Sequence, residues 1–278
     1  MSDSQHNRPV IADIGGHRFV WGSRTYVMGI VNVTPDSFSG DGLADDREAA
    51  VAQGLRMVDE GADLLDVGGE STRPGHVPIS GADEIDRTEE VVRRLSRESH
   101  VPVSIDTYKL EVAEAAVAAG ATIVNDIWGL TRSPALAELA ARYDCALVLM
   151  HNQDSTDYPG DLMTEVKRFL RTAVDAAVAA GAPRERILVD PGIGFGKTAE
   201  QNWEVMRRLE ELKELGQPVL VGTSRKSFIG KLLDLPVTER VEGTAATVTA
   251  SVLRGADVVR VHDVREMMRV VRVADRMR

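Results

Sequence analysis

Two apolar, valine-rich stretches of strand length end abruptly in cationic and hydroxyl residues. The first runs from Val219 to Lys231 (VLVGTSRKSFIGK), and the second runs from Asp257 to Asp263 (DVVRVHD). Positive charge at the ends of two neighbouring strands indicates an anion site, and the loops after strands seven and eight of an α/β barrel often hold a phosphate. The charged groups concerned include Lys226, Arg260 and His262.

Earlier strand-like stretches end in carboxylates and amides instead. Hydrogen-bond acceptors that line an enclosed mouth suit a flat heterocycle bearing several N–H donors, because a buried polar edge is costly to leave unmatched. Taken singly, Asp106 and Asp190 could equally be turn or helix-cap residues. The acceptors are Asp106, Asn125 and Asp190, beside the apolar residues Ile127, Met150 and Phe195; Asp66 is a further polar residue at a strand end.

A second group of side chains suits a phosphate or pyrophosphate, which guanidinium groups bind with two parallel hydrogen bonds. Arg260 and His262 are two residues apart on a strand and therefore point to the same face. The whole set predicts a site for a heterocycle joined to a phosphate leaving group. The expected phosphate residues are Arg73, Lys226, Arg260 and His262, with Asn32 on the opposite wall.

About eight strand–helix units follow one another from Tyr26 to Met277, and their strands read as continuously apolar. This pattern predicts an α/β fold, a (β/α)₈ TIM barrel, with an open doubly wound sheet as the alternative. Gly15-Gly16 predicts an N-terminal β-hairpin over 11–21. We also expect long helices over 200–215 and 237–253, a flexible tail at 1–9 and a single domain at 10–278.

The composition limits the classes of function. The formal charge of -10 argues against general binding to nucleic acid or to an anionic membrane. No run of about 18 apolar residues predicts a membrane span. Cys145 is the single cysteine, so no internal disulfide can form, and we expect a buried thiol and a reducing, cytoplasmic location. The glycine-rich DPGIGFGK run lacks the spacing of a nucleotide-binding P-loop.

The chain resembles the dihydropteroate synthase family in order from about Val27 to Asp263. That resemblance implies a barrel enzyme, usually a homodimer, that joins 6-hydroxymethyl-7,8-dihydropterin pyrophosphate to p-aminobenzoate and releases pyrophosphate in folate synthesis. The matching stretches are GIVNVTPDSFSGDG (29–42), DVGGESTRPG (66–75), VSIDT (103–107), IVND (123–126), LMH (149–151), DPGIGFGK (190–197), GTSRKSFIG (222–230) and RVHD (260–263).

The resemblance also implies roles for individual residues, which fall into three groups. The pterin would lie against Asp106, Asn125, Ile127, Met150, Asp190, Phe195, Lys226 and Arg260. The pyrophosphate would be held by Asn32, Arg73, Arg260 and His262, with Asn32 also binding a Mg²⁺ cofactor. The p-aminobenzoate would meet Phe38, Thr72, Pro74, Lys226 and Ser227. The residues expected to act in catalysis are Arg73, Asp106, Lys226, Arg260 and His262.

Two other functions fit parts of the pattern. A methyltetrahydrofolate corrinoid methyltransferase shares the pterin-binding Asp and Asn positions but has no pyrophosphate for the cationic clusters to hold. A non-catalytic pterin-binding paralogue is the other alternative. Sulfonamides mimic p-aminobenzoate in this family, so the chain would be either their target or a resistant form. The segment HNQDSTDYPGD (151–161) departs from the family's familiar variants, and its role is open.

Overall fold

The computed structural model describes residues 10–33, 43–71 and 77–278. Within them, an eight-stranded sheet has the order β8-β7-β6-β5-β4-β3-β10-β9, and each paired neighbour runs parallel. A parallel bridge between Val189 and Val219 joins the two ends of this sheet and closes the barrel. The strands are β3 (Tyr26–Asn32), β4 (Leu64–Gly68), β5 (Val103–Asp106), β6 (Ile123–Asp126), β7 (Ala146–Met150), β8 (Ile187–Asp190), β9 (Leu220–Val221) and β10 (Val258–Val261).

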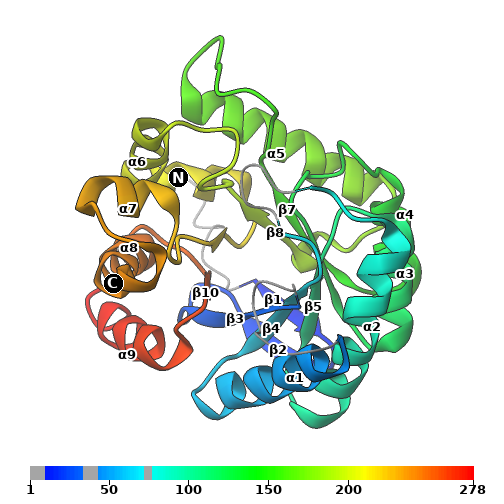
Figure 1. Ribbon diagram of the computed structural model, residues 1–278. Coiled ribbons are helices and arrows are strands. Elements are labelled where there is room, and N and C mark those ends of the chain that lie inside the picture. The colour runs from blue at the N-terminus through cyan, green and yellow to red at the C-terminus, as the bar shows by residue number, and fades with distance from the viewer. Residues whose placement is uncertain (1–9, 34–42, 72–76) are drawn as a thin grey trace.

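Helices surround the strands as an outer ring, which Figure 1 shows in chain order from α1 to α9. The strands are therefore buried on both faces, which explains their continuously apolar sequences. The predicted (β/α)₈ barrel is confirmed, and the open sheet is excluded. The helices are α1 (Leu43–Asp59), α2 (Gly81–Glu98), α3 (Leu110–Ala119), α4 (Ala135–Tyr143), α5 (Leu162–Ala179), α6 (Ala199–Arg207), α7 (Ser227–Leu233), α8 (Val241–Leu253) and α9 (Val264–Ala274).

Two predicted helices differ from the observed elements. The helix expected over 200–215 is interrupted at Arg208, whose φ of -110° and ψ of 15° leave the α region, and a 3₁₀ helix continues from Leu209 to Leu215. The helix expected over 237–253 begins only at Val241. The short helix α7, which follows Lys226, was not predicted; it ends at Asp234 in a left-handed conformation with φ of 55°.

The predicted N-terminal hairpin is confirmed. Strands β1 (Ile11–Ile14) and β2 (His17–Val20) pair antiparallel, and Gly15 and Gly16 between them have φ of 58° and 78°. Positive φ at both central residues is what a tight two-residue turn requires. Phe19 stacks on Trp21 at 5.2 Å and lies 4.9 Å from the ring of Tyr26, where β3 begins.

This hairpin covers the amino-terminal end of the barrel. Its buried side chains share one apolar cluster with residues near the starts of the barrel strands, among them Leu64, Ile123 and Val258. The opposite, carboxyl-terminal end is therefore the one that can present polar strand ends to a ligand.

Cys145 is buried and free, as expected. The helices within the described ranges are too short or too polar to traverse a lipid bilayer. The tail at 1–9 lies outside the described residues, and the one-domain division stays a prediction.

Candidate active site

Four polar strand residues meet at the carboxyl-terminal mouth of the barrel. Arg260 on β10 reaches across it: its Nε lies 2.5 Å from Asp66 Oδ2 on β4, and its Nη2 lies 2.7 Å from Asp106 Oδ2 at the end of β5. Asn125 on β6 donates from Nδ2 to Asp66 Oδ2 at 2.9 Å. The mouth therefore holds a connected network of two carboxylates, an amide and a guanidinium group.

Each carboxylate in this network keeps one oxygen unused. Asp66 Oδ1 and Asp106 Oδ1 are buried and have no hydrogen-bond partner among the described residues. A buried acceptor left unmatched costs about 1–3 kcal/mol, so a ligand that brings N–H donors would relieve that cost. Burial also raises the pKa of Asp106 to about 7, against the opposing effect of Arg260. Asp106 is thus an acceptor whose charge state is sensitive to what binds beside it.

Lys226 and Asp190 form the other side of the mouth. Burial lowers the pKa of Lys226 to about 8, while the charge of Asp190 opposes the change. Burial likewise raises the pKa of Asp190, and Lys226 opposes it. A Cβ added at Gly222 would lie 3.7 Å from Arg260 Cβ and 3.9 Å from Lys226 Nζ, so the two cations flank the same glycine. Lys226 therefore lies at the same mouth as Arg260.

An apolar wall accompanies these polar groups. Ile127 and Met150 follow or end barrel strands and are buried. Phe195 belongs to the loop between β8 and α6, and its ring centroid lies 4.7 Å from Lys226 Nζ. Apolar side chains that pack on the faces of a planar heterocycle, with acceptors along its edge, are the arrangement such a ligand needs.

His262 and Asn32 lie at strand ends next to this network. Ser224 Oγ accepts a hydrogen bond from the backbone N–H of His262 at 3.1 Å and lies 2.9 Å from His262 Nδ1. Ser224 thereby fixes the orientation of the imidazole ring. Asn32 ends β3, and a Cβ added at Gly68 would lie 3.9 Å from Asn32 Oδ1 and 3.8 Å from Asp106 Oδ2. Asn32 thus faces the same mouth as Asp106.

The residues at the mouth could hold Mg²⁺ only together with a phosphorylated substrate. Across residues 10–33, 43–71 and 77–278, no group of three His, Cys, Asp or Glu side chains could hold a metal ion. Mg²⁺ commonly takes one or two protein oxygens and completes its octahedron with substrate phosphates and water. The amide oxygen of Asn32 can serve as such a protein ligand, so the donor set fits a metal that arrives with a phosphorylated substrate.

Some predicted site residues are not tested by the structure. Ser227 is exposed at the first position of α7, directly after Lys226. The expected p-aminobenzoate residues Phe38, Thr72 and Pro74 and the expected pyrophosphate ligand Arg73 lie outside the described residues. The proposed contacts of these four residues remain predictions.

Two residues were given no role by sequence reasoning. Asp66 was noted as a polar strand residue only, yet it is fully buried and is bound by both Arg260 and Asn125. Its signal was a carboxylate within an otherwise apolar strand, which needs a buried partner. Lys197, the last residue of DPGIGFGK, is buried against His151. Nothing in its sequence context distinguishes it from a solvent-exposed lysine.

Comparison with known proteins agrees with this geometry. The family profile described as pterin binding enzyme matches residues 28–262. A curated relative from Clostridium beijerinckii, named dihydropteroate synthase, is 50% identical over 263 residues, which are 94% of this chain and 97% of the relative.

The chain belongs to the dihydropteroate synthase family. Solved structures of family members have the same fold. The enzyme from Clostridium difficile, crystallised in the presence of pteroic acid, superposes with a TM-score of 0.91 at 48% identity and covers 93% of this chain and 98% of that one. The enzyme from Xanthomonas albilineans with 4-aminobenzoic acid gives 0.92 at 43% identity, covering 97% and 98%.

Proposed function

We propose that this transferase condenses 6-hydroxymethyl-7,8-dihydropterin pyrophosphate with p-aminobenzoate to give 7,8-dihydropteroate and pyrophosphate. The observation that supports this reaction most directly is the convergence of Asp66, Asp106 and Asn125 with Arg260 in one barrel mouth. Acceptors for a donor-rich ring lie there beside a cation suited to a departing anion.

The pterin would occupy the acceptor side of the mouth. Asp106, Asn125 and Asp190 would receive its ring and amino N–H groups, and Lys226 would donate to its carbonyl oxygen. Met150, Ile127 and Phe195 would pack on its faces, with Arg260 stacked on the ring. The unmatched Asp106 oxygen supports this placement, because a buried acceptor without a partner gains from a ligand that brings N–H donors.

Departure of the pyrophosphate requires stabilisation of negative charge. Arg260 and His262 would bind the leaving group together with Arg73. Asn32 would hold a Mg²⁺, which when bound supplies positive charge beside the pyrophosphate oxygens. As the C–O bond breaks, the Asp106 carboxylate would stabilise the positive charge that the dihydropterin ring takes up from its exocyclic carbon.

The incoming nucleophile is the amino nitrogen of p-aminobenzoate. This aniline is neutral at pH 7, so its lone pair can attack the exocyclic carbon without a strong general base. Lys226 and Ser227, at the start of α7, would bind its carboxylate side. Phe38, Thr72 and Pro74 would complete that pocket. The displacement would be dissociative: the C–O bond breaks first, the nitrogen then forms the new C–N bond at the exocyclic carbon, and one proton leaves the nitrogen.

The direct test is pyrophosphate release from the pterin substrate on addition of p-aminobenzoate. We expect release that depends on both substrates. Binding of the pterin without release would instead favour the non-catalytic paralogue, and transfer of a methyl group to a corrinoid would favour the methyltransferase. Adding a sulfonamide to the same assay decides whether the chain is a drug target, since inhibition requires that the p-aminobenzoate pocket accept the mimic.

The reaction is expected in the cytoplasm, where a free cysteine is stable.

Lys226→Ala should weaken the binding of both substrates. Lys226 lies beside Gly222 near Arg260 and directly precedes Ser227, the first residue of α7, so we expect its ammonium to contact both ligands. Loss of a charge-assisted hydrogen bond should raise the KM for each substrate about tenfold. Steady-state kinetics with each substrate varied in turn measures this. Lys231→Ala, an exposed change on the same helix, should leave both constants unchanged, and a Lys226→Ala defect confined to one substrate contradicts the shared placement.

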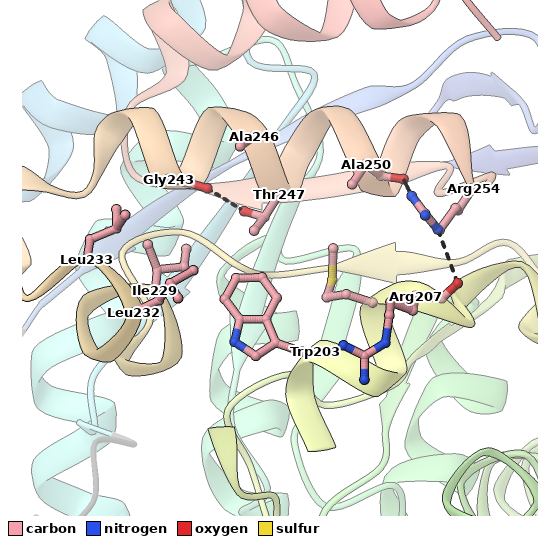
Figure 2. A pocket seen from close by; sticks show the side chains of 11 residues that line it. Trp203, Arg207, Ile229, Leu232, Leu233, Gly243, Ala246, Thr247, Ala250 and Arg254 are labelled. Atoms are coloured by element: carbon pink, nitrogen blue, oxygen red, sulfur yellow. Dashed lines mark hydrogen bonds between the residues drawn. The ribbon is translucent and has the colours of Figure 1, made fainter. Parts of the chain in front are cut away.

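We also propose that the chain forms a homodimer through α7 and α8. Leu232, Leu233, Val237 and Leu253 are exposed large apolar side chains in and beside these helices. Leu232 and Leu233 line a hollow of about 290 Å³ between α6, α7 and α8, which Trp203 and Ile229 also line (Figure 2). A second copy would bury this apolar surface. Sedimentation should give a dimer for the parent chain and a folded monomer for L232E/L233E; a monomeric parent would refute the proposal.

A further inference from the structure

The segment between β7 and α5 contacts the loop between β8 and α6. Tyr158 Oη donates a hydrogen bond to the backbone oxygen of Gly196 at 2.8 Å. Its ring stacks on the imidazole of His151, with centroids 5.9 Å apart and 26° between the planes. A Cβ added at Gly196 would lie 2.7 Å from the backbone oxygen of Gln153, so the two backbones approach closely. The 152–161 segment, which departs from the family's familiar variants, therefore lies directly against the 191–198 loop.

Lys197 is buried and bonds to backbone oxygens of the same loop. Its Nζ lies 2.9 Å from His151 Nδ1 and donates to the backbone oxygens of Gly192 and Phe195, both at 3.1 Å. Burial lowers the pKa of Lys197 to about 7; in its ammonium form the group has three donors, and all of them are used. Burial lowers the pKa of His151 to about 3, and the charge of Lys197 adds to the effect. The imidazole is thus a neutral acceptor, held between Tyr158 and Lys197.

The loop also contacts the pterin side of the active site. Lys226 Nζ donates to the backbone oxygen of Ile193, and the Phe195 ring lies 4.7 Å from the same nitrogen. Gly194 has a φ of +85°, and a Cβ there would lie 2.9 Å from Lys226 Cδ. A displacement of the loop would therefore move Phe195 and remove the acceptor that orients Lys226.

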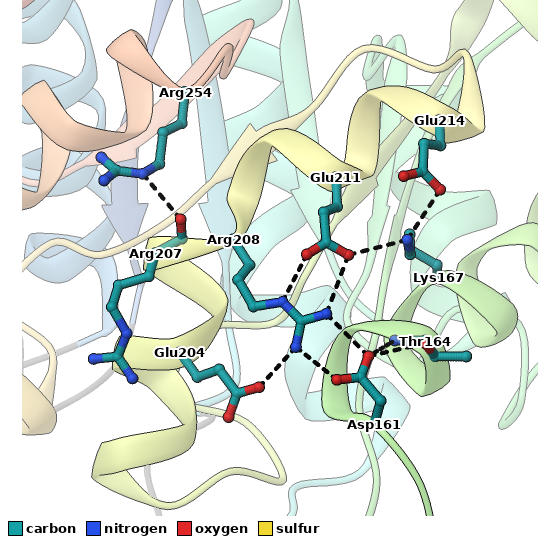
Figure 3. Close-up of polar contacts among 9 residues, drawn as sticks. All are labelled: Asp161, Thr164, Lys167, Glu204, Arg207, Arg208, Glu211, Glu214 and Arg254. Atoms are coloured by element: carbon teal, nitrogen blue, oxygen red, sulfur yellow. Dashed lines mark hydrogen bonds and ion pairs between the residues drawn. The ribbon is translucent and has the colours of Figure 1, made fainter.

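The far end of the segment is anchored independently. Asp161 caps α5 by accepting from the backbone N–H of Thr164 at 2.9 Å. The same carboxylate pairs with Arg208 at 2.7 Å and 3.0 Å, at the end of α6 (Figure 3). Arg208 binds Glu204 and Glu211 as well. Tyr158 thus extends from a segment that is fixed at one end to α6 and at the other to β7.

We propose that Tyr158 is a positioning residue for the pterin. Acting through Gly196 and through the His151–Lys197 pair, it holds the 191–198 loop so that Phe195 and Lys226 are placed for the ring before the substrate arrives. This inference rests on the proposed pterin site. It assigns a role to the 152–161 segment, which connects β7 to α5.

The test is Tyr158→Phe, which keeps the ring on His151 and removes only the hydroxyl donor. Without that bond the loop must be ordered on binding, so the KM for the pterin pyrophosphate should rise about fourfold, while the KM for p-aminobenzoate changes less than about twofold. Calorimetric titration with 6-hydroxymethylpterin should show a matching loss of affinity. Tyr143→Phe, which removes a hydroxyl from an exposed tyrosine at the end of α4, is the matched control and should change neither constant.

The outcomes separate this inference from the proposed reaction. An active parent chain whose Tyr158→Phe variant keeps the parent's pterin KM and 6-hydroxymethylpterin affinity overturns the positioning role. Equal losses for both substrates, together with a lowered Tm, also overturn it, because they indicate general destabilisation. If the parent chain releases no pyrophosphate, the proposed reaction fails, and the calorimetric comparison of Tyr158→Phe with Tyr143→Phe then decides the inference alone.

Discussion

Asp106→Asn should bind the pterin substrate but lose at least about a hundredfold in turnover. The amide keeps the size of the side chain and one acceptor oxygen, so ground-state contacts largely persist. It removes the negative charge that faces the ring when the pyrophosphate leaves. Because the ring gains positive charge in the transition state, the loss should slow the chemical step. Single-turnover measurements with saturating p-aminobenzoate would report the chemical step, and calorimetry with 6-hydroxymethylpterin would report binding.

A matched change elsewhere controls for the loss of a carboxylate. Asp144→Asn removes an exposed acid at the end of α4, where asparagine tolerates the left-handed backbone with φ of 58°. It should leave turnover unchanged. Full turnover in Asp106→Asn would remove the catalytic role assigned to this residue, and lost binding with normal turnover would make it a ligand contact only.

The same assignment sets the pH dependence. Burial raises the pKa of Asp106 to about 7, with Arg260 opposing the change. Because the carboxylate is the required form, kcat/KM for the pterin should be lost as pH falls below that pKa and should level off above it. The Asp106→Asn variant should lack this acidic limb. An acidic limb that persists in the variant would assign the titration to another group.

Much of the architecture followed from the sequence because it is written in local patterns. Buried parallel strands are apolar throughout, so the eightfold alternation of strands and helices could be recognised in the sequence. Gly15-Gly16 indicated the hairpin because a tight two-residue turn requires positive φ. The boundaries that failed lie where tertiary contacts overrule helical periodicity. Arg208 interrupts the expected long helix while it pairs with Asp161, a residue 47 positions away that local pattern cannot reveal.

The active site shows the same division. Strand-end position placed Asp106, Asn125, Asp190 and Arg260 at one mouth, because parallel strands end on the same side. The pairing of Arg260 with Asp66 joins residues 194 positions apart and depends on side-chain reach across the barrel. Likewise, Lys197 became significant only once its three acceptors were seen in space. Sequence supplied the groups, and closure of the barrel decided which of them touch.

Arg260→Met should cost both turnover and stability. Methionine keeps an unbranched apolar stem but lacks the guanidinium group, so it leaves the carboxylates of Asp66 and Asp106 without their cation. Breaking a buried ion pair by removing one partner typically costs about 3–5 kcal/mol in the free energy of unfolding. Loss of the leaving-group contact should lower kcat about a thousandfold. Denaturant titration and steady-state kinetics measure the two effects separately.

A second substitution distinguishes the two roles of Arg260. In the double variant R260M/D66N, the carboxylate that is fully buried becomes a neutral amide, so part of the lost stability should return. Turnover should not return, because nothing replaces the cation at the leaving group. Arg24→Met is the matched control: Arg24 is half-exposed where it pairs with Asp63, so the loss should cost no more than about 1 kcal/mol. If R260M/D66N regained activity along with stability, Arg260 would be a structural counter-ion for Asp66, and the pyrophosphate would have to be held by other groups.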